Sequence, residues 1–238
     1  MKKTTQNGLS SRFGITLAII VLISVFLIYS YSNGQVRNEQ DLISKTSDAL
    51  EKTRSYRFEM HSDLLMMNEN FQIIKAEGQV DVFNNNMYQL TTFQNRTVEV
   101  VVINDQVYYR ENNGIWQIEK MENAEKLNEI LSDQHLILSS AENATMSKEG
   151  DVWLLEIIPE QEKVQEQMES MGIDTSGIEL KSFVTRYWID AGTYHISEIG
   201  SVINGEMNFM GLKTPIELKS TILLSDYNKK ISMKAPSP

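Results

Sequence analysis

Histidine, serine and cysteine are the residue types that most often carry catalysis or bind a transition metal. In this chain the spacing of His and Ser, and the lack of Cys, support neither role. The three histidines, His61, His135 and His195, are widely separated, whereas a zinc site or a general base needs partners at short spacing, as in an HExxH helix. Ser139 and Ser140 lack the Gly-x-Ser-x-Gly context of a hydrolase nucleophile. The chain contains no Cys, which excludes a thiol nucleophile, a thiolate metal site and a lipid attached through cysteine. We therefore expect no enzymatic activity, no catalytic or metal-binding residue and no cofactor.

The charge of the chain narrows the range of partners. Its 22 Lys and Arg residues stand against 32 Asp and Glu, a formal net charge of −10. All the acidic residues follow residue 38, whereas Lys2, Lys3 and Arg12 precede it, so the larger part is more acidic still. Such a surface repels nucleic acid and anionic lipid headgroups. We expect no nucleic-acid partner, although a lipid held inside an apolar pocket remains compatible with this charge.

The N-terminal part of the sequence contains an uncharged apolar run, residues 13–31, which is close to the roughly 20 residues that a membrane-spanning helix needs. The basic residues before it predict a cytoplasmic N-terminus, residues 1–12, with the bulk of the chain outside the cell. The alternative is a cleaved secretory signal, with Ser32 and Gly34 as weak cleavage positions. The length of the run favours a retained single-pass anchor, and cleavage would make the protein secreted. Both alternatives export the domain.

The stretch from Tyr56 to Met66 shows the clearest pattern in the chain, because apolar and polar residues alternate through most of it. A repeat of two is the side-chain period of a strand, and a half-buried strand needs antiparallel neighbours. Asn-rich turns at 84–86, 104–105 and 112–114 separate further short apolar stretches, as in a meander of hairpins. The expected strands are residues 56–66, 71–83, 87–93, 97–103, 106–110, 115–119, 152–158, 183–190, 194–199, 206–212 and 216–224.

Three segments instead show the 3.6-residue period of an amphipathic helix, residues 38–54, 123–139 and 162–171. In the second of the expected strands, the change of parity between Ile73 and Ile74 predicts a β-bulge. Helices and strands together predict an α+β fold, an antiparallel sheet with helices on one face, preceded by the N-terminal transmembrane helix.

Two short motifs, residues 55–60 (SYRFEM) and 187–194 (YWIDAGTY), lie within this order of elements. With them the chain resembles the LolA-like superfamily of exported lipoprotein and lipid carriers, which includes the LppX and LprG type, over residues 39–234. The resemblance implies a strongly curved half-barrel sheet whose concave apolar face, covered by helices, holds acyl chains or an acylated protein. It leaves residues 32–38 as a linker and 235–238 as a tail.

The sequence departs from this family by lacking the cysteine that would carry a lipid anchor. A spanning helix would also prevent diffusion between two membranes, so we expect local capture, handover or sensing at the membrane surface. The expected hydrophobic cleft is lined by apolar residues of the strands and helices, and each of them could equally be a packed core residue. They are Tyr56, Phe58, Met60, Leu64, Val80, Val82, Leu90, Val100, Val102, Tyr109, Leu127, Ile130, Leu131, Met168, Met171, Tyr187 and Ile189.

Two alternatives to a lipid-binding module remain. One is a non-enzymatic regulatory or sensor ectodomain with a closed core that contacts another envelope protein. The other is an exported hydrolase, which ranks last because no nucleophile and base are paired. Asn95 and Asn143 each begin an Asn-x-Thr sequence and are candidate glycosylation sites.

Overall fold

The computed structural model describes residues 36–93, 95–120, 131, 134–135, 137–138, 141, 143–159, 178–209 and 212–236. The chain divides into two compact units, Met1–Arg37 and Asn38–Pro238, and the second contains all of the secondary structure considered below. The expected anchor, residues 13–31, lies outside the described residues. Within the described part of the chain, no helix combines the length and the apolar composition needed to span a bilayer.

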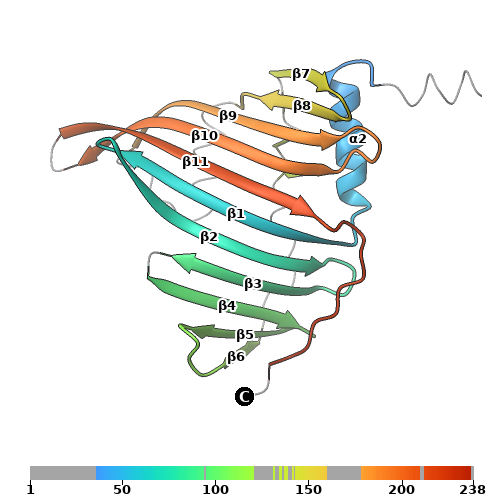
Figure 1. Ribbon diagram of the computed structural model, residues 1–238, viewed down its shortest axis with the longest axis vertical. Helices are drawn as coiled ribbons and strands as arrows, with labels where there is room; N and C mark the ends of the chain where they lie inside the picture. Colours follow the sequence, from blue (N-terminus) through green and yellow to red (C-terminus); the bar gives the residue numbers. More distant parts are fainter. Residues whose placement is uncertain are drawn as a thin grey trace, which may run out of the picture. The chain divides into compact units, whose positions relative to one another are not determined.

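The described residues of the second unit form one antiparallel sheet of eleven strands (Figure 1). In the sheet they lie in the order β6-β5-β4-β3-β2-β1-β11-β10-β9-β8-β7. The strands are β1 (Ser55–Met66), β2 (Glu69–Asp81), β3 (Asn86–Phe93), β4 (Arg96–Ile103), β5 (Gln106–Glu111), β6 (Gln117–Lys120), β7 (Ala144–Glu149), β8 (Val152–Ile157), β9 (Ile178–Asp190), β10 (Ile196–Phe209) and β11 (Leu212–Ser225).

This order joins two meanders through the pairing of β1 with β11, which we call the seam. Strands β1 to β6 run outward one after another, and β7 begins at the opposite edge of the sheet. From there β7 to β11 run back inward until β11 pairs with β1, with Phe58 opposite Leu224. The seam therefore joins the first and last strands of the sheet, and the sheet remains open because β6 and β7 are its two edges.

Local sequence explains the turns and the one expected irregularity. Asn85, Asn104 and Asn112 have positive φ, a conformation that Asn adopts more easily than most residues. Between β1 and β2, Ser62 pairs with Ile74 and Asp63 with Gln72, so Ile73 is the extra residue of a bulge. The bulge predicted from the parity change is confirmed.

Helix α2 (Glu39–Glu51) precedes the sheet and is slightly shorter than the predicted 38–54. The side chain of Asn38 caps its start by accepting a hydrogen bond from the Asp41 amide at 2.9 Å. The helix buries one stripe, Leu42, Ile43, Thr46 and Leu50. This stripe contributes to the apolar core together with side chains from the sheet, among them Tyr56, Val80, Leu155, Tyr187, Ile189 and Ile199.

The predicted fold class is wrong. The expectation was an α+β fold with helices covering a concave sheet face, and a transmembrane helix before it. Instead, strands dominate the described residues, and α2 is the one helix described along its whole length, with 13 residues. A helix of that length is about 20 Å long, whereas eleven strands span about 48 Å across the sheet. Helix α2 therefore covers a minor part of one face.

Candidate functional site

Antiparallel pairing defines which side chains share a face, because residues directly opposite one another point the same way. We call the face that carries Tyr56 and Phe58 the apolar face. In the middle of the sheet it contains a row of four register partners on adjacent strands, Leu64 on β1, Leu218 on β11, Ile203 on β10 and Phe183 on β9. We call these four residues the outer row. All four are half-buried, so apolar surface is available here.

A second row lies four residues nearer the α2 end of the same strands and is more deeply buried. Met60, Ile222, Ile199 and Tyr187 are register partners there, followed by Leu155 on β8. Ile199, Tyr187 and Leu155 are fully or almost fully buried. Met60 and Ile222 are half-buried, so the inner row belongs to the packed core from β10 to β8, whereas no residue of the outer row does.

Hydroxyl groups separate the two rows. Ser62, Ser220, Ser201 and Thr185 are register partners across β1, β11, β10 and β9. Ser62 Oγ donates to Ser220 Oγ at 3.0 Å, and Thr185 Oγ1 lies 3.2 Å from Ser201 Oγ. Each of these bonds uses one of the two hydroxyl hydrogens of its pair. This hydroxyl row therefore presents further hydrogen-bonding capacity in the middle of an otherwise apolar face.

The outer row extends toward the far ends of the long strands. Leu180 on β9 is buried, and Ile178, Phe183 and Ile203 pack against it. On the other side of the seam, Phe71 on β2 is the register partner of Leu64. Apolar side chains thus continue from β9 to β2 without a charged residue in the row.

The apolar face also continues across β3, β4 and β5. Met87, Val102 and Val107 are register partners, and Val100 lies opposite Tyr109. Val102 is buried and the other four are half-buried. The Tyr109 hydroxyl donates to Glu119 Oε1 at 3.1 Å, a bond that raises the pKa of this tyrosine.

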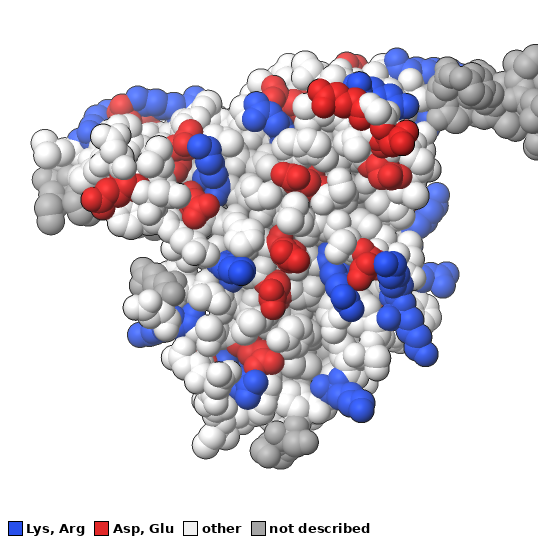
Figure 2. All heavy atoms as spheres, viewed as in Figure 1, with Lys and Arg blue, Asp and Glu red and all other residues white. Residues whose placement is uncertain are grey.

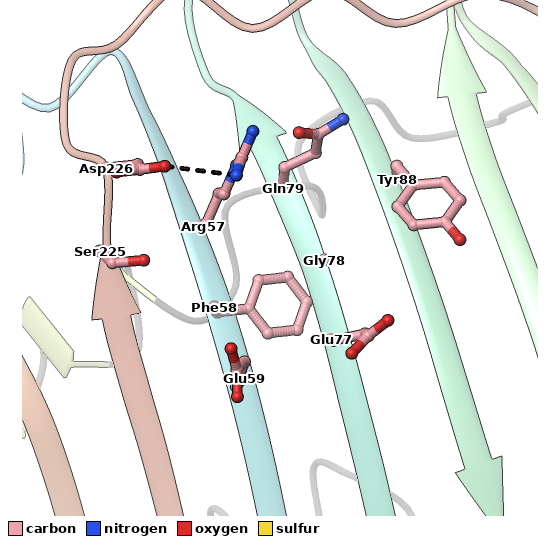
Figure 3. Close-up of a pocket in the computed structure, with 9 residues that line it drawn as sticks. All are labelled: Arg57, Phe58, Glu59, Glu77, Gly78, Gln79, Tyr88, Ser225 and Asp226. Atoms are coloured by element: carbon pink, nitrogen blue, oxygen red, sulfur yellow. Dashed lines mark ion pairs between the residues drawn. The ribbon is translucent and has the colours of Figure 1, made fainter.

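The opposite face is polar and carries charged side chains of both signs. Figure 2 shows a face of the sheet on which acidic and basic side chains are interspersed. A shallow depression of about 360 Å³ lies at the start of β1 and is lined mainly by polar residues (Figure 3). In it Arg57 forms an ion pair with Asp226 at 3.4 Å. The Phe58 side chain belongs to the apolar face, where it lies against Gly78. The carboxylates of Glu59 and Glu77, which are direct register partners, make this depression unsuitable for an apolar chain.

Two tyrosines of the apolar face, Tyr56 and Tyr187, are buried. The Tyr187 hydroxyl donates to Gln134 Oε1 at 2.8 Å, and burial raises the pKa of Tyr187 far above its usual range. Burial likewise raises the pKa of Tyr56. Within the described residues the Tyr56 hydroxyl has no hydrogen-bond partner. Both tyrosines therefore remain neutral at every physiological pH and serve packing rather than proton transfer.

A smaller cavity of about 260 Å³ lies between α2 and the β9–β10 turn, with Lys45, Thr193 and His195 in its wall. His195 stacks on Tyr227 with ring centroids 4.3 Å apart, and burial lowers the pKa of His195. The described residues contain no group of three or more His, Cys, Asp or Glu side chains that could hold a metal ion. Nothing in this cavity resembles a catalytic arrangement.

The residues predicted to line a hydrophobic cleft fall into three groups. Leu131 is buried at a helical position, Val82 follows the end of β2, and Leu90 lies on the polar face opposite Glu77 and Glu99. Leu127, Ile130, Met168 and Met171 lie outside the described residues. On the apolar face the register brings together Tyr56, Phe58, Met60, Leu64, Val80, Val100, Val102, Tyr109, Tyr187 and Ile189.

The prediction did not include most of the outer row. Ile203, Leu218 and Phe183 belong to strands whose alternation is visible in the sequence, but Leu64, the residue that they continue on β1, is far away along the chain. The hydroxyl row was missed for the same reason. Asn95 and Asn143, the candidate glycosylation sites, are both exposed.

Comparison with known proteins adds information on the fold. No protein-family profile and no curated protein matches this sequence. Among solved structures, LprF from Mycobacterium bovis matches with a TM-score of 0.51 at 14% identity, covering 84% of this chain and 97% of LprF. A LolA superfamily protein from Nitrosomonas europaea matches with a TM-score of 0.30 at 9% identity, covering 83% of this chain and 96% of that protein. A DUF1329 family protein from Desulfovibrio piger also gives 0.30, at 10% identity, covering 82% and 93%.

The two TM-scores of 0.30 are too low to indicate a shared fold. The likeness to LprF, at 14% identity, concerns the fold alone. At the level of the fold the predicted resemblance is confirmed, because the chain shares its fold with LprF.

Proposed function

We propose that this protein is an exported, non-enzymatic binding protein that holds a lipid, an acylated protein or another long apolar molecule on the apolar face of its sheet. The observation that carries the proposal is the contrast between the two rows of that face. Three of the five inner-row residues are buried, whereas the four adjacent apolar side chains of the outer row are all half-buried. Leaving such a row in contact with water is unfavourable unless a ligand covers it.

The arrangement suits an amphipathic ligand rather than a plain hydrocarbon. Ser220 and Ser201 lie beside Leu218 and Ile203 on the same strands, so an acyl chain on the outer row would place an ester or carboxyl group within reach of the hydroxyl row. Each methylene group removed from water contributes about 0.8 kcal/mol. Ten of them would give roughly 8 kcal/mol before the entropic cost of binding.

The site of action follows from the N-terminal sequence. We propose that residues 13–31 direct the domain out of the cell and tether it to the membrane, where it captures, hands over or senses its ligand. Cell fractionation followed by protease treatment of intact cells tests this part alone. Digestion of the domain in intact cells, with the protein in the membrane fraction, is the expected result.

Ligand binding is tested by native mass spectrometry of the purified full chain and by solvent extraction of the same sample. We expect a bound lipid or fatty acid. Because the apolar residues 13–31 could retain lipid themselves, two variants of neighbouring residues on β10 serve as matched controls. Ile203→Asn alters the apolar face and should lose the ligand, whereas Val202→Asn alters the polar face and should retain it.

The proposal would be rejected if neither variant lost the bound ligand. It would also be rejected if the unmodified chain held no ligand and took up no fluorescent fatty acid. The chain would then fit the alternative of an interaction domain with a closed core.

A further inference from the structure

The four members of the hydroxyl row are not equivalent. Ser62 and Thr185, at its two ends, are buried, with 6% and 1% of their surface exposed. Ser220 and Ser201, between them, are half-buried. They lie on the neighbouring strands β11 and β10 (Figure 1) and are direct register partners. The two accessible hydroxyls of the row are therefore adjacent to one another.

The buried hydroxyls determine which hydrogens of the row are used. Ser62 Oγ donates to Ser220 Oγ at 3.0 Å. In the other pair Thr185 Oγ1 lies 3.2 Å from Ser201 Oγ, and the distance alone allows either atom to be the donor. A buried hydroxyl hydrogen without an acceptor is costly, so Thr185 donates and Ser201 accepts. The hydrogens of Ser220 and Ser201 consequently remain available to a ligand.

Two available hydrogens on neighbouring strands suit a group that only accepts hydrogen bonds. Side chains that face one another across an antiparallel pair have Cβ atoms about 5 Å apart. One acceptor between Ser220 and Ser201 can therefore lie about 2.8 Å from both hydroxyl oxygens. A carbonyl oxygen has two lone pairs and can accept both bonds. A plain hydrocarbon would leave both hydrogens without an acceptor.

The surroundings of the hydroxyl row are uncharged. The outer row and the inner row, which flank it on the same strands, contain no charged residue. Toward one edge of the sheet the row ends with Ile157 on β8 and Ala144 on β7. In the other direction its first charged residue is Arg96 on β4. Arg96 is four strands from Ser220, about 19 Å away. A carboxylate bound at Ser220 would thus lose water without gaining a cation, which is unfavourable.

The position of the row also suits the head of an acyl chain. The outer row lies two residues further along each strand, about 7 Å away. On the other side the inner row is packed from β10 to β8. A chain that begins at Ser220 and Ser201 can therefore extend over the outer row, toward the apolar side chains that pack against Leu180.

We propose that Ser220 and Ser201 select ligands whose acyl chain ends in a neutral ester, and disfavour the anion of a free fatty acid. This inference rests on the proposed function, because it concerns the head group of the molecule bound on the apolar face. The ester carbonyl accepts from both hydroxyls while the chain covers the outer row. The fatty-acid anion still binds through its chain, but more weakly.

The test compares three ligands of similar chain length, added to the purified full chain at about pH 8, where a carboxylic acid is ionised. They are methyl dodecanoate, dodecanoate, and methyl dodecyl sulfide, whose thioether sulfur is a weak acceptor. Displacement of a fluorescent fatty acid gives the Kd of each. The ester should bind about 10-fold more tightly than the sulfide, because it gains two neutral hydrogen bonds. It should also bind about 10-fold or more tighter than the anion.

Variants of the row separate recognition of the ester from packing of the sheet. Ser62→Ala removes a buried donor but keeps the Ser220 hydroxyl, so the ratio of ester to sulfide affinity should not change. Adding Ser220→Ala should lower this ratio about 5-fold, because one donor to the ester is lost. Removing both members of a bonded pair leaves no buried hydroxyl unpaired, so the double variant should fold.

The second pair repeats this comparison, with Thr185→Val as the control and Thr185→Val with Ser201→Ala as the double variant. Residues 13–31 are the same in every variant, so any ligand that they retain does not alter the comparison.

Equal affinities for the ester and the sulfide in the unmodified chain would overturn the inference. So would an anion that binds as tightly as the ester, or a ratio that is unchanged in both double variants. In each of these cases the ligands still bind and the proposed function stands. If the chain binds none of the three ligands, the proposed function fails, and this inference fails with it.

Discussion

The position of the ligand can be tested with two leucines on the same strand. Leu218 and Leu223 both belong to β11, but Leu218 is in the outer row and Leu223 is on the polar face, 40% exposed. We consider the substitutions Leu218→Asn and Leu223→Asn. Asn has the same number and branching of side-chain heavy atoms as Leu, so each change replaces apolar by polar surface while keeping the shape of the side chain.

The expected effects differ because only one of these leucines would contact the ligand. Leu218 lies between Leu64 and Ile203 in the outer row. Covering a leucine side chain with ligand is worth about 1.5–3 kcal/mol. Leu218→Asn should therefore weaken binding about 10- to 100-fold. Leu223 lies between Glu59 and Glu198, and Leu223→Asn should leave the affinity unchanged.

The assay is an equilibrium titration of the full chain with a fluorescent fatty acid, with thermal unfolding measured on the same samples. If Leu218→Asn does not fold, Leu64→Asn tests the same row from β1. The ligand does not lie on the outer row if variants of the two faces lose affinity equally. The same conclusion follows if neither outer-row variant loses affinity.

Three further predictions concern stability. Tyr187→Phe should lower the free energy of unfolding by about 1–3 kcal/mol, because it leaves the buried Gln134 oxygen without its 2.8 Å hydrogen bond. Gly78→Ala should cost about 1–3 kcal/mol in chemical denaturation, because a Cβ there would clash with the Tyr88 carbonyl oxygen and the Phe58 ring; unchanged stability would contradict this close approach. Hydrogen bonds donated by the β9–β10 turn lower the pKa of Asp190, so its stabilising effect is complete above the unfolded-state pKa of about 3.9 and is lost as pH falls through the lower folded value. Asp190→Asn should therefore be less stable than the wild type at pH 7, and the difference should shrink below about pH 4 in thermal melts.

Much of the sheet could be predicted because its information is local. The alternation from Tyr56 to Met66 corresponds to β1, and the parity change at Ile73 corresponds to the bulge. Asn-rich turns mark the β2–β3, β4–β5 and β5–β6 hairpins for the same reason, since Asn tolerates positive φ.

The features that were missed depend on contacts between distant residues. Ser62 and Ser220 are 158 positions apart, and nothing in either neighbourhood indicates that they pair. The sequence predicts Leu90 on the apolar face, because Tyr88 and Leu90 are about as apolar as Met87, which lies on the other side of the same strand. Only the pairing of β3 with β2 and β4 places Leu90 beside two glutamates.

The fold class was wrong for a different reason. The 3.6-residue period of residues 38–54, 123–139 and 162–171 predicts three helices, and a half-buried sheet is expected to be covered by them. The strands form a sheet about 48 Å wide, and α2 with its 13 residues is the one helix described in full.

The claim that a ligand lies on the apolar face is tested most directly by photocrosslinking. The full chain is loaded with a fatty acid that carries a diazirine near the middle of its chain, irradiated and digested, and the modified peptides are identified by mass spectrometry. The account predicts crosslinks to Leu64, Ile203 and Leu218, the outer-row residues on the three strands at and beside the seam. Crosslinks confined to the polar face, around Arg57 and Glu77, would contradict it.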